Sequence, residues 1–155
     1  MNILYCGDKT MQKGILLSSM SLIKNVDEPL NIYILTVDYR EKGINYKPVD
    51  KAFAKYLKEK LNKSDIKVNI FLVDVTRFFV EELPEANMQS RFTACCMLRL
   101  FADKTDIKDR VLYLDTDVLC RKDFRDFYYQ NMDGIEIAGV SDYYGRWLFG
   151  DGYIN

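Results

Sequence analysis

The stretch Leu-Asn-Ile-Tyr-Ile-Leu-Thr-Val at residues 30–37 is almost wholly apolar. A strand of this kind has both faces covered, which is typical of a parallel sheet lying between layers of helices. Asp27, Glu28 and Pro29 stand directly before it and would end a helix there, because the residue before a proline avoids the helical region. The stretch therefore predicts a central strand of an α/β fold.

On the N-terminal side of this strand, the sequence predicts another strand and then a helix. Residues 3–6 are apolar, and Gly7 and Asp8 close the run. Because this strand begins so early, we expect no signal peptide before the fold. A helix is expected between residues 11 and 26, where one helical face carries Ile15, Ser19, Leu22, Ile23 and Val26.

The C-terminal side continues the alternation of strands and helices. After a polar loop at 39–48, an amphipathic helix is expected to about residue 63, with Val49, Phe53, Leu57 and Leu61 recurring every four residues. We further predict strands at 66–73, 111–114 and 135–140, a short helix at 78–83, and a helix that begins at Ser90 and carries Phe92, Cys95, Leu98 and Phe101. This order predicts an α/β sandwich with a mostly parallel sheet.

The composition limits the classes of protein that this chain can represent. With 155 residues, 48% of them apolar, the chain can form one domain with a sizeable core. A net charge of −1 provides no basic surface for nucleic acid or for anionic membranes. No apolar run approaches the roughly 20 residues of a membrane span. We therefore expect a cytoplasmic protein with no transmembrane segment and no nucleic-acid partner.

The chain contains no histidine, which excludes several kinds of active site. Triads with a histidine base and zinc sites that need histidine are ruled out. The four cysteines, Cys6, Cys95, Cys96 and Cys120, include no C-x-x-C pair, so they indicate neither a zinc site nor a disulfide framework. Any chemistry must come from carboxylates, Arg, Lys, Tyr, hydroxyl groups or a hard metal ion.

The segment 111–119, Val-Leu-Tyr-Leu-Asp-Thr-Asp-Val-Leu, places two carboxylates at the end of an apolar strand. A D-x-D triplet alone is common, but the apolar residues on both sides make this one specific. In an open α/β sheet, ligands bind beyond the carboxyl ends of the strands. An extended backbone would direct Asp115 and Asp117 to one side, where two hard oxygen ligands suit Mg²⁺ or Mn²⁺ with phosphate oxygens and water. A solvated turn after the strand is the alternative interpretation.

Three further side chains are candidates for the same edge of the sheet. Asp8 follows the first strand, and Asp142 follows the strand predicted at 135–140. Arg99 lies on an apolar helix, where a guanidinium needs a carboxylate, a phosphate or a route to solvent. In a parallel sheet these side chains would gather with Asp115 and Asp117. Taken singly, each also fits a helix cap, a turn or a surface arginine.

These segments together resemble glycosyltransferase family 8, the retaining enzymes of the glycogenin and lipopolysaccharide galactosyltransferase type. Residues 2–8 resemble the family's first strand and its uridine-contacting turn, and residues 98–100 resemble its A-R-L segment. Residues 109–119 are similar to its K-V-L-Y-L-D-x-D-x-L signature. Residues 139–142 resemble the segment whose aspartate contacts the donor sugar, and residues 153–155 the start of Y-F-N-[AS]-G-V.

The resemblance implies a GT-A type, Rossmann-like nucleotide-diphospho-sugar transferase sandwich. It also implies a UDP-sugar donor, Mn²⁺ or Mg²⁺ as the metal, and transfer of a hexose with retention to a carbohydrate acceptor such as lipopolysaccharide or another cell-surface glycan. Asp115 and Asp117 would hold the metal, while Arg99 and Asp142 would be catalytic. The donor-binding residues would be Cys6, Gly7, Asp8, Thr10, Arg99, Asp115, Thr116, Asp117 and Asp142.

The sequence departs from the family pattern in its metal ligands and at its end. The family's third protein ligand is a histidine, and this chain has none. Residues 150–155 stop where a strand would begin, so we expect residues 1–155 to be the nucleotide-sugar-binding part of one truncated GT-A domain, without the acceptor-binding half and with little activity alone. For the full-length protein, peripheral attachment at the inner membrane is an option.

Two alternative functions stay open at this point. A haloacid-dehalogenase-type phosphatase also carries D-x-D after an apolar strand, with the first aspartate as its nucleophile. That motif usually follows the first strand, whereas here the triplet follows the fourth predicted strand. A non-catalytic nucleotide-binding module is the other alternative.

Overall fold

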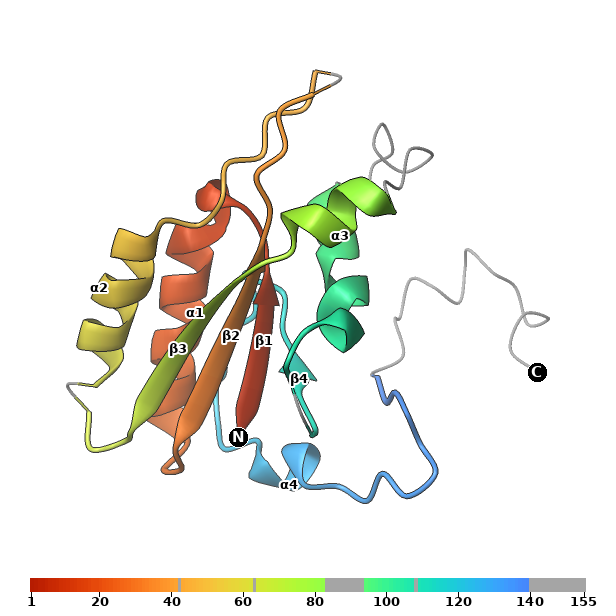
Figure 1. Cartoon of the computed structure of the whole chain (residues 1–155). Coiled ribbons are helices and arrows are strands. Elements are labelled where there is room, and N and C mark those ends of the chain that lie inside the picture. The colour runs from red at the N-terminus through yellow and green to blue at the C-terminus, as the bar shows by residue number, and fades with distance from the viewer. Residues whose placement is uncertain (42, 63, 83–93, 108, 140–155) are drawn as a thin grey trace, which may run out of the picture.

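The computed structural model describes residues 1–41, 43–62, 64–82, 94–107 and 109–139. In this part of the chain, four parallel strands form one sheet with the order β3-β2-β1-β4 (Figure 1). Strand β1 spans Asn2–Cys6, β2 spans Leu30–Thr36, β3 spans Val68–Asp74 and β4 spans Leu112–Tyr113. The parallel α/β sheet predicted from the sequence is therefore confirmed.

Helices cover both faces of this sheet, as Figure 1 shows. One face is covered by α1 (Gln12–Asn25) and α2 (Lys51–Leu61), and the other by α3 (Thr76–Glu81) and η3 (Ala94–Lys104), a 3₁₀ helix. Two short elements, η1 (Lys9–Met11) and α4 (Arg125–Tyr128), join the larger ones. Among the described residues, no helix is both long and apolar enough to cross a membrane.

The two faces hold separate hydrophobic clusters because side chains alternate along each strand. In β1, Ile3 belongs to the cluster that contains Ile15 of α1, whereas Leu4 belongs to the cluster that contains Leu98 of η3. All four residues are at most 2% exposed. This burial on both sides explains why β1 and β2 are almost continuous apolar runs in the sequence.

The helix predicted from Ser90 exists in part, and its described part is a 3₁₀ helix. Ser90 and Phe92 lie outside the described residues, and residues 94–104 form a 3₁₀ helix. Its buried residues Cys95, Leu98 and Phe101 are three positions apart. That spacing stacks side chains on one face of a helix with three residues per turn. The sequence predicted a helix here without fixing its type, and 3₁₀ helices of this length are uncommon.

The two C-terminal strands differ most from the prediction. The strand expected at 111–114 contains only the two residues of β4, and the strand expected at 135–140 is wrong for its described part. Residues 135–139 pair with no described strand, and Ile137 is 88% exposed. Apolar composition alone suggested that strand, but a strand also needs a neighbour that accepts its backbone hydrogen bonds.

Three asparagines at one level of the sheet form hydrogen bonds that support the register of β1, β2 and β3. Asn31 of β2 stands opposite Asn2 of β1 and Asn69 of β3. The amide of Asn31 donates to Oδ1 of Asn2, and the amide of Asn69 donates to Oδ1 of Asn31, both at 3.0 Å. A slip of one residue would turn each side chain to the other face and break both bonds.

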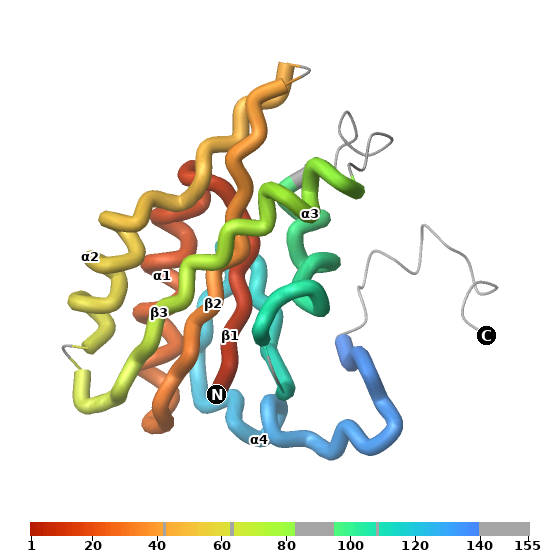
Figure 2. The backbone as a smooth tube through the Cα atoms, in the orientation of Figure 1, coloured from red at the N-terminus to blue at the C-terminus, as the bar shows by residue number. Residues whose placement is uncertain are grey.

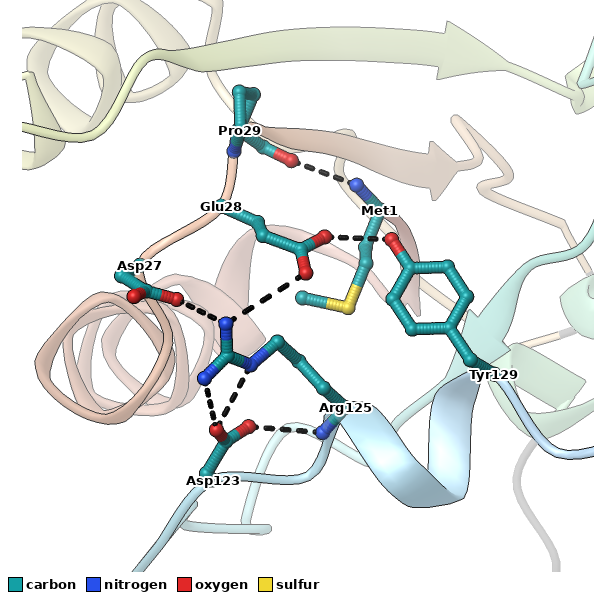
Figure 3. Close-up of polar contacts among 7 residues, drawn as sticks. All are labelled: Met1, Asp27, Glu28, Pro29, Asp123, Arg125 and Tyr129. Carbon is teal, nitrogen blue, oxygen red and sulfur yellow. Dashed lines mark hydrogen bonds and ion pairs between the residues drawn. The ribbon is translucent and has the colours of Figure 1, made fainter.

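At the amino ends of the strands, charged side chains pair with one another (Figure 3). The guanidinium of Arg125, on α4, contacts the carboxylates of Asp27, Glu28 and Asp123. The hydroxyl of Tyr129 donates to Oε2 of Glu28 at 2.6 Å. These contacts attach α4 to the turn between α1 and β2.

A buried tyrosine joins the same end of the sheet to α4. The hydroxyl of Tyr128 accepts from the backbone N–H of Asn2 at 2.9 Å and donates to the carbonyl of Arg110 at 2.9 Å. The side-chain amide of Asn2 also donates to that carbonyl, at 3.1 Å. Tyr128 thus bridges the first residue of β1 and the segment that leads into β4.

Candidate functional site

The carboxyl ends of β1 and β4 are neighbours in the sheet. Leu4 of β1 pairs with Tyr113 of β4, and the N–H of Leu114 donates to the carbonyl of Leu4 at 3.0 Å. Because the strands are parallel, the segment that leads to Asp8 and the segment that leads to Asp115 leave the sheet at the same edge. The fold therefore brings these two predicted segments side by side.

The D-x-D triplet forms a tight turn directly after β4. The N–H of Val118 donates to the carbonyl of Asp115 at 3.1 Å, and residues 116–117 are the turn residues. The extended backbone that we expected to direct both carboxylates to one side is therefore absent. Both carboxylates are exposed, and Asp117 makes no hydrogen bond or ion pair with the described part of the chain.

Arg99 connects η3 with the D-x-D turn. Its Nε donates to the carbonyl of Cys96 at 2.8 Å, and its guanidinium carbon lies 4.1 Å from the centre of the Tyr113 ring. Nη2 lies 3.4 Å from Oδ1 of Asp115, close enough for an ion pair. The carbonyl, the ring and the carboxylate hold the guanidinium from three directions, so the structure supplies the partner that an arginine on this helix needs.

Tyr113 is a residue of this region that our sequence reasoning missed. Its hydroxyl donates to Oδ1 of Asp115 at 2.5 Å. Burial raises the pKa of Tyr113 above its ordinary value, and the hydrogen bond to Asp115 raises it further. The hydroxyl therefore stays protonated and remains a donor. The sequence carried a signal only through the predicted extended segment, in which a residue two positions before Asp115 would share its face.

On its other side, the D-x-D turn lies against the start of α1. A Cβ at Gly14 would lie 2.6 Å from the carbonyl oxygen of Thr116. The Thr116 hydroxyl lies 3.5 Å from the sulfur of Met11. The side chain of Thr116, which we predicted to bind the donor, thus contacts α1 in this structure. Gly14 is a second residue that the sequence reasoning missed.

Asp8 is 6% exposed and caps the short helix η1. Its Oδ1 accepts hydrogen bonds from the N–H of Thr10 at 3.0 Å and from the Thr10 hydroxyl at 2.5 Å. A Cβ at Gly7 would lie 2.7 Å from Cγ of Met11, so the chain leaves β1 close to η1. The sequence analysis left a helix cap open as one role for Asp8, and the structure shows this cap. Both hydrogen bonds go to Oδ1, and no described residue donates to Oδ2.

Two buried thiols lie beside these charged groups. Burial raises the pKa of Cys6 to about 12, and the nearby Arg99 and Asp115 modify it in opposite directions. Burial also raises the pKa of Cys95 to about 12, with Asp8 nearby. Arg99 and Asp115 therefore lie near Cys6, and Asp8 lies near Cys95. Both thiols stay protonated near neutral pH, so neither is a nucleophile there.

Both predicted metal ligands, Asp115 and Asp117, lie in the described part of the chain. Within it, no group of three or more Asp, Glu, Cys or His side chains is placed to hold a metal ion. Asp115 and Asp117 are two candidate oxygen ligands in one turn, with Oδ1 of Asp115 already in contact with Tyr113 and Arg99. Asp142, predicted to bind the donor sugar, lies outside the described residues.

Comparison with solved structures identifies the class of fold. The apo-form glycosyltransferase GlyE from Streptococcus pneumoniae TIGR4 is similar, with a TM-score of 0.58 and 18% sequence identity. The similarity covers 84% of this chain and 27% of that chain, so this chain spans little more than a quarter of the GlyE length. The fold is thus the GT-A type, Rossmann-like sandwich of a glycosyltransferase, as the sequence predicted.

Comparison with family profiles identifies the family. The profile of Glycosyl transferase family 8 matches residues 2–151, nearly the whole chain, and the chain belongs to this family. A comparison with curated protein sequences gave no match. Family membership excludes the phosphatase alternative. The position of the triplet agrees, because the D-x-D of such phosphatases usually follows the first strand, whereas here it follows β4.

Proposed function

We propose that this chain provides the donor-binding site of a glycosyltransferase that transfers a hexose from a UDP-sugar, with a divalent metal ion and with retention of configuration. The observation that carries the proposal is the D-x-D turn beside Arg99, at the same sheet edge as Asp8 and at the carboxyl end of a parallel sheet, in a chain of glycosyl transferase family 8. Open α/β sheets bind their ligands at this end. UDP, hexose and retention are inferred from the family resemblance.

The two carboxylates of the turn fit Mn²⁺ or Mg²⁺. Such ions are commonly held by one or two carboxylates together with phosphate oxygens and water. Asp117 is exposed and has no partner among the described residues, and Asp115 has Oδ2 in addition to the oxygen that Tyr113 and Arg99 contact. Diphosphate oxygens and water would supply further ligands to the ion. The bound ion would neutralise the diphosphate as UDP leaves.

Arg99 would bind the donor as a cation that is already ordered. The Cys96 carbonyl and the Tyr113 ring hold one edge and one face of the guanidinium, which leaves other N–H groups for phosphate or sugar oxygens. A side chain that is fixed beforehand loses less conformational freedom when the ligand binds. Its ion pair with Asp115 would have to loosen or be shared when the metal and diphosphate enter.

The other predicted residues would surround the same donor. Asp8, fixed by Thr10, would contact the uracil end of UDP through its second oxygen, and Asp142 would hold the donor sugar together with Arg99. Cys6, Gly7 and Thr116 would line the donor site. The acceptor would be a carbohydrate, such as lipopolysaccharide or another cell-surface glycan.

Calorimetric titration of UDP into the chain, once with Mn²⁺ and once with EDTA, tests the donor site. We expect measurable affinity only with Mn²⁺, because the ion links the diphosphate to the two carboxylates. UMP is the matched control, since it lacks the second phosphate and should gain much less from Mn²⁺. Equal UDP affinity under both conditions would rule out a metal-dependent donor site.

A second assay separates an enzyme from a non-catalytic nucleotide-binding module. Release of UDP from a panel of UDP-hexoses, with and without glycan acceptors, is measured on the full-length protein that contains this chain, with Mn²⁺ present. An enzyme should release UDP from one preferred donor faster than the solution background. Binding of the same donors without any release would favour the binding module.

A further inference from the structure

The segment after the D-x-D turn is held along one face of α1. Gly14 lies against Thr116, the Ser21 hydroxyl accepts from the N–H of Cys120 at 2.8 Å, and the Asn25 amide donates to the carbonyl of Cys120 at 3.1 Å. These three helix residues are seven and four positions apart, which places them on one face. In Figure 2 this segment, drawn in cyan, returns from the carboxyl end of the sheet toward α4.

The contact at Gly14 leaves no room for a side chain. A Cβ there would lie 2.6 Å from the carbonyl oxygen of Thr116 and 3.1 Å from its Cβ. Neither of these atoms can move away through a rotation of a side chain. Any larger residue at position 14 would therefore require a shift of the helix or of the turn.

The turn is the part that would move. The helix is anchored in the core by Ile15 and Leu22, which are 0% and 2% exposed. The turn is short and exposed, and its far end is fixed to Ser21 through Cys120. A displacement would therefore be taken up between residues 115 and 119, which include both carboxylates of the D-x-D triplet.

We propose that Gly14 is a positioning residue for the metal ligands: its missing Cβ lets the backbone of Thr116 rest on α1 and so sets the placement of Asp115 and Asp117. The inference rests on the proposed function, because metal binding by Asp115 and Asp117 is part of that function. Glycine is among the least favourable residues in a helix, so its use in the first turn of α1 fits a need for close approach. Mg²⁺ and similar ions tolerate little distortion of their ligands.

The variant Gly14→Ala tests the proposal. We expect the affinity for Mn²⁺ in the presence of UDP, measured from the paramagnetic resonance signal of free Mn²⁺, to fall about tenfold or more. The thermal midpoint without metal should fall only modestly, because the helix preference of alanine offsets part of the cost of moving the Thr116 backbone. A merely structural role would lower the midpoint in the same way but would leave the affinity of the folded fraction unchanged. Lys13→Ala, on the exposed side of the same turn of helix, should leave both quantities unchanged.

Hydrogen exchange without any ligand separates this inference from the proposed function. In Gly14→Ala, the amide of Val118, bonded to Asp115, should exchange faster while the amides of α1 keep their rates. The wild type could bind UDP equally well without metal while the Val118 amide still exchanges faster in the variant. In that case the proposed function fails, but the inference that Gly14 positions the D-x-D turn holds. Unchanged exchange together with unchanged Mn²⁺ affinity would overturn the inference.

A second pair of variants applies if Gly14→Ala does not fold. Ser21→Ala removes the hydroxyl that accepts from Cys120, whereas Ser21→Thr keeps a hydroxyl. We expect the alanine variant to weaken Mn²⁺ affinity and the threonine variant to restore most of it. Equal Mn²⁺ affinities in both variants and the wild type would show that α1 does not position the turn.

Discussion

The two ends of the sheet differ in what their polar side chains contact. At the amino end, Arg125 contacts three carboxylates, and the Tyr128 hydroxyl both accepts and donates a hydrogen bond. At the carboxyl end, Asp117 has no partner among the described residues, and Asp115 uses one oxygen for Tyr113 and Arg99. Partners within the chain stabilise the amino end, while at the carboxyl end Asp117 and one oxygen of Asp115 have no partner among the described residues.

The same contrast separates the two arginines. Arg125 is surrounded by Asp27, Glu28 and Asp123, so carboxylates satisfy its charge (Figure 3). Arg99 is held by a carbonyl and an aromatic ring and has one carboxylate at 3.4 Å. A guanidinium that is fixed but only partly neutralised suits an anionic ligand. If this comparison is right, substitutions at the two ends should affect different measurements.

Asp117→Asn should have the largest effect, and on ligand affinity alone. Loss of a charged metal ligand should reduce the Mn²⁺-dependent affinity for UDP by at least about a hundredfold. The thermal midpoint should not fall, because Asp117 is exposed and makes no hydrogen bond or ion pair with the described residues. Calorimetry and thermal unfolding on the same sample provide both readouts. A variant that loses stability but keeps its affinity would reverse the comparison.

Tyr128→Phe should affect stability alone. The change removes the hydroxyl that accepts from the N–H of Asn2 and donates to the carbonyl of Arg110. The Tyr128 side chain is only 7% exposed, so water cannot easily replace that hydroxyl. Leaving two such groups without this partner should cost about 2 kcal/mol in the free energy of unfolding. Urea denaturation measures the loss, and UDP affinity of the folded chain serves as the control. A change in affinity with no change in stability would mean that the two ends are coupled.

Raising the pH should destabilise the carboxyl end through its thiols. Burial raises the pKa of Cys6 and Cys95 from 9.0 to about 12, so the folded chain keeps protons that the unfolded chain releases. The stabilisation is complete below pH 9 and is lost as the pH rises from 9 toward 12, by up to about 1 kcal/mol per pH unit for each thiol. Urea denaturation between pH 8 and 10.5 measures this slope. Cys95→Ala should make it shallower, and an identical slope in that variant would contradict the assignment.

Arg125→Gln should have the smallest effect. Its ion pairs lie at the surface, where water and salt weaken them, and the Arg125 side chain is 36% exposed. We expect a slight fall in thermal midpoint at low salt that disappears at high salt, with UDP affinity unchanged. A large fall at high salt would show that Arg125 acts through packing rather than charge.

The fold was predictable where the pattern was long and regular. The apolar run at 30–37 indicated a strand covered on both faces, and β2 has alternate residues in each cluster. The four-residue recurrence from Val49 to Leu61 indicated α2. Prediction failed at residues 135–139, because apolar composition does not reveal whether a pairing partner exists. It also missed the 3₁₀ form of η3, since a three-residue spacing is compatible with both helix types.

The candidate site was predictable as residue types but not as contacts. The sequence singled out Asp8, Arg99, Asp115 and Asp117, and the fold places Asp8 and Asp115 at one edge with Arg99 between η3 and the turn. The extended backbone that it predicted for the two carboxylates is absent, because a turn replaces it. The roles of these residues toward donor and metal remain predictions.

By itself, the sequence determined the class of fold, the edge of the sheet that carries the carboxylates, and the kind of chemistry that a chain without histidine can support. These follow from local patterns, since apolar periodicity and residue type act over a few positions. Only the tertiary structure decided that Tyr113 and Arg99 share one oxygen of Asp115, and that Gly14 lies against Thr116. These contacts join residues as many as 102 positions apart in the printed sequence. Their geometry depends on how β1, β4, α1 and η3 pack together, and packing is a property of the whole folded chain.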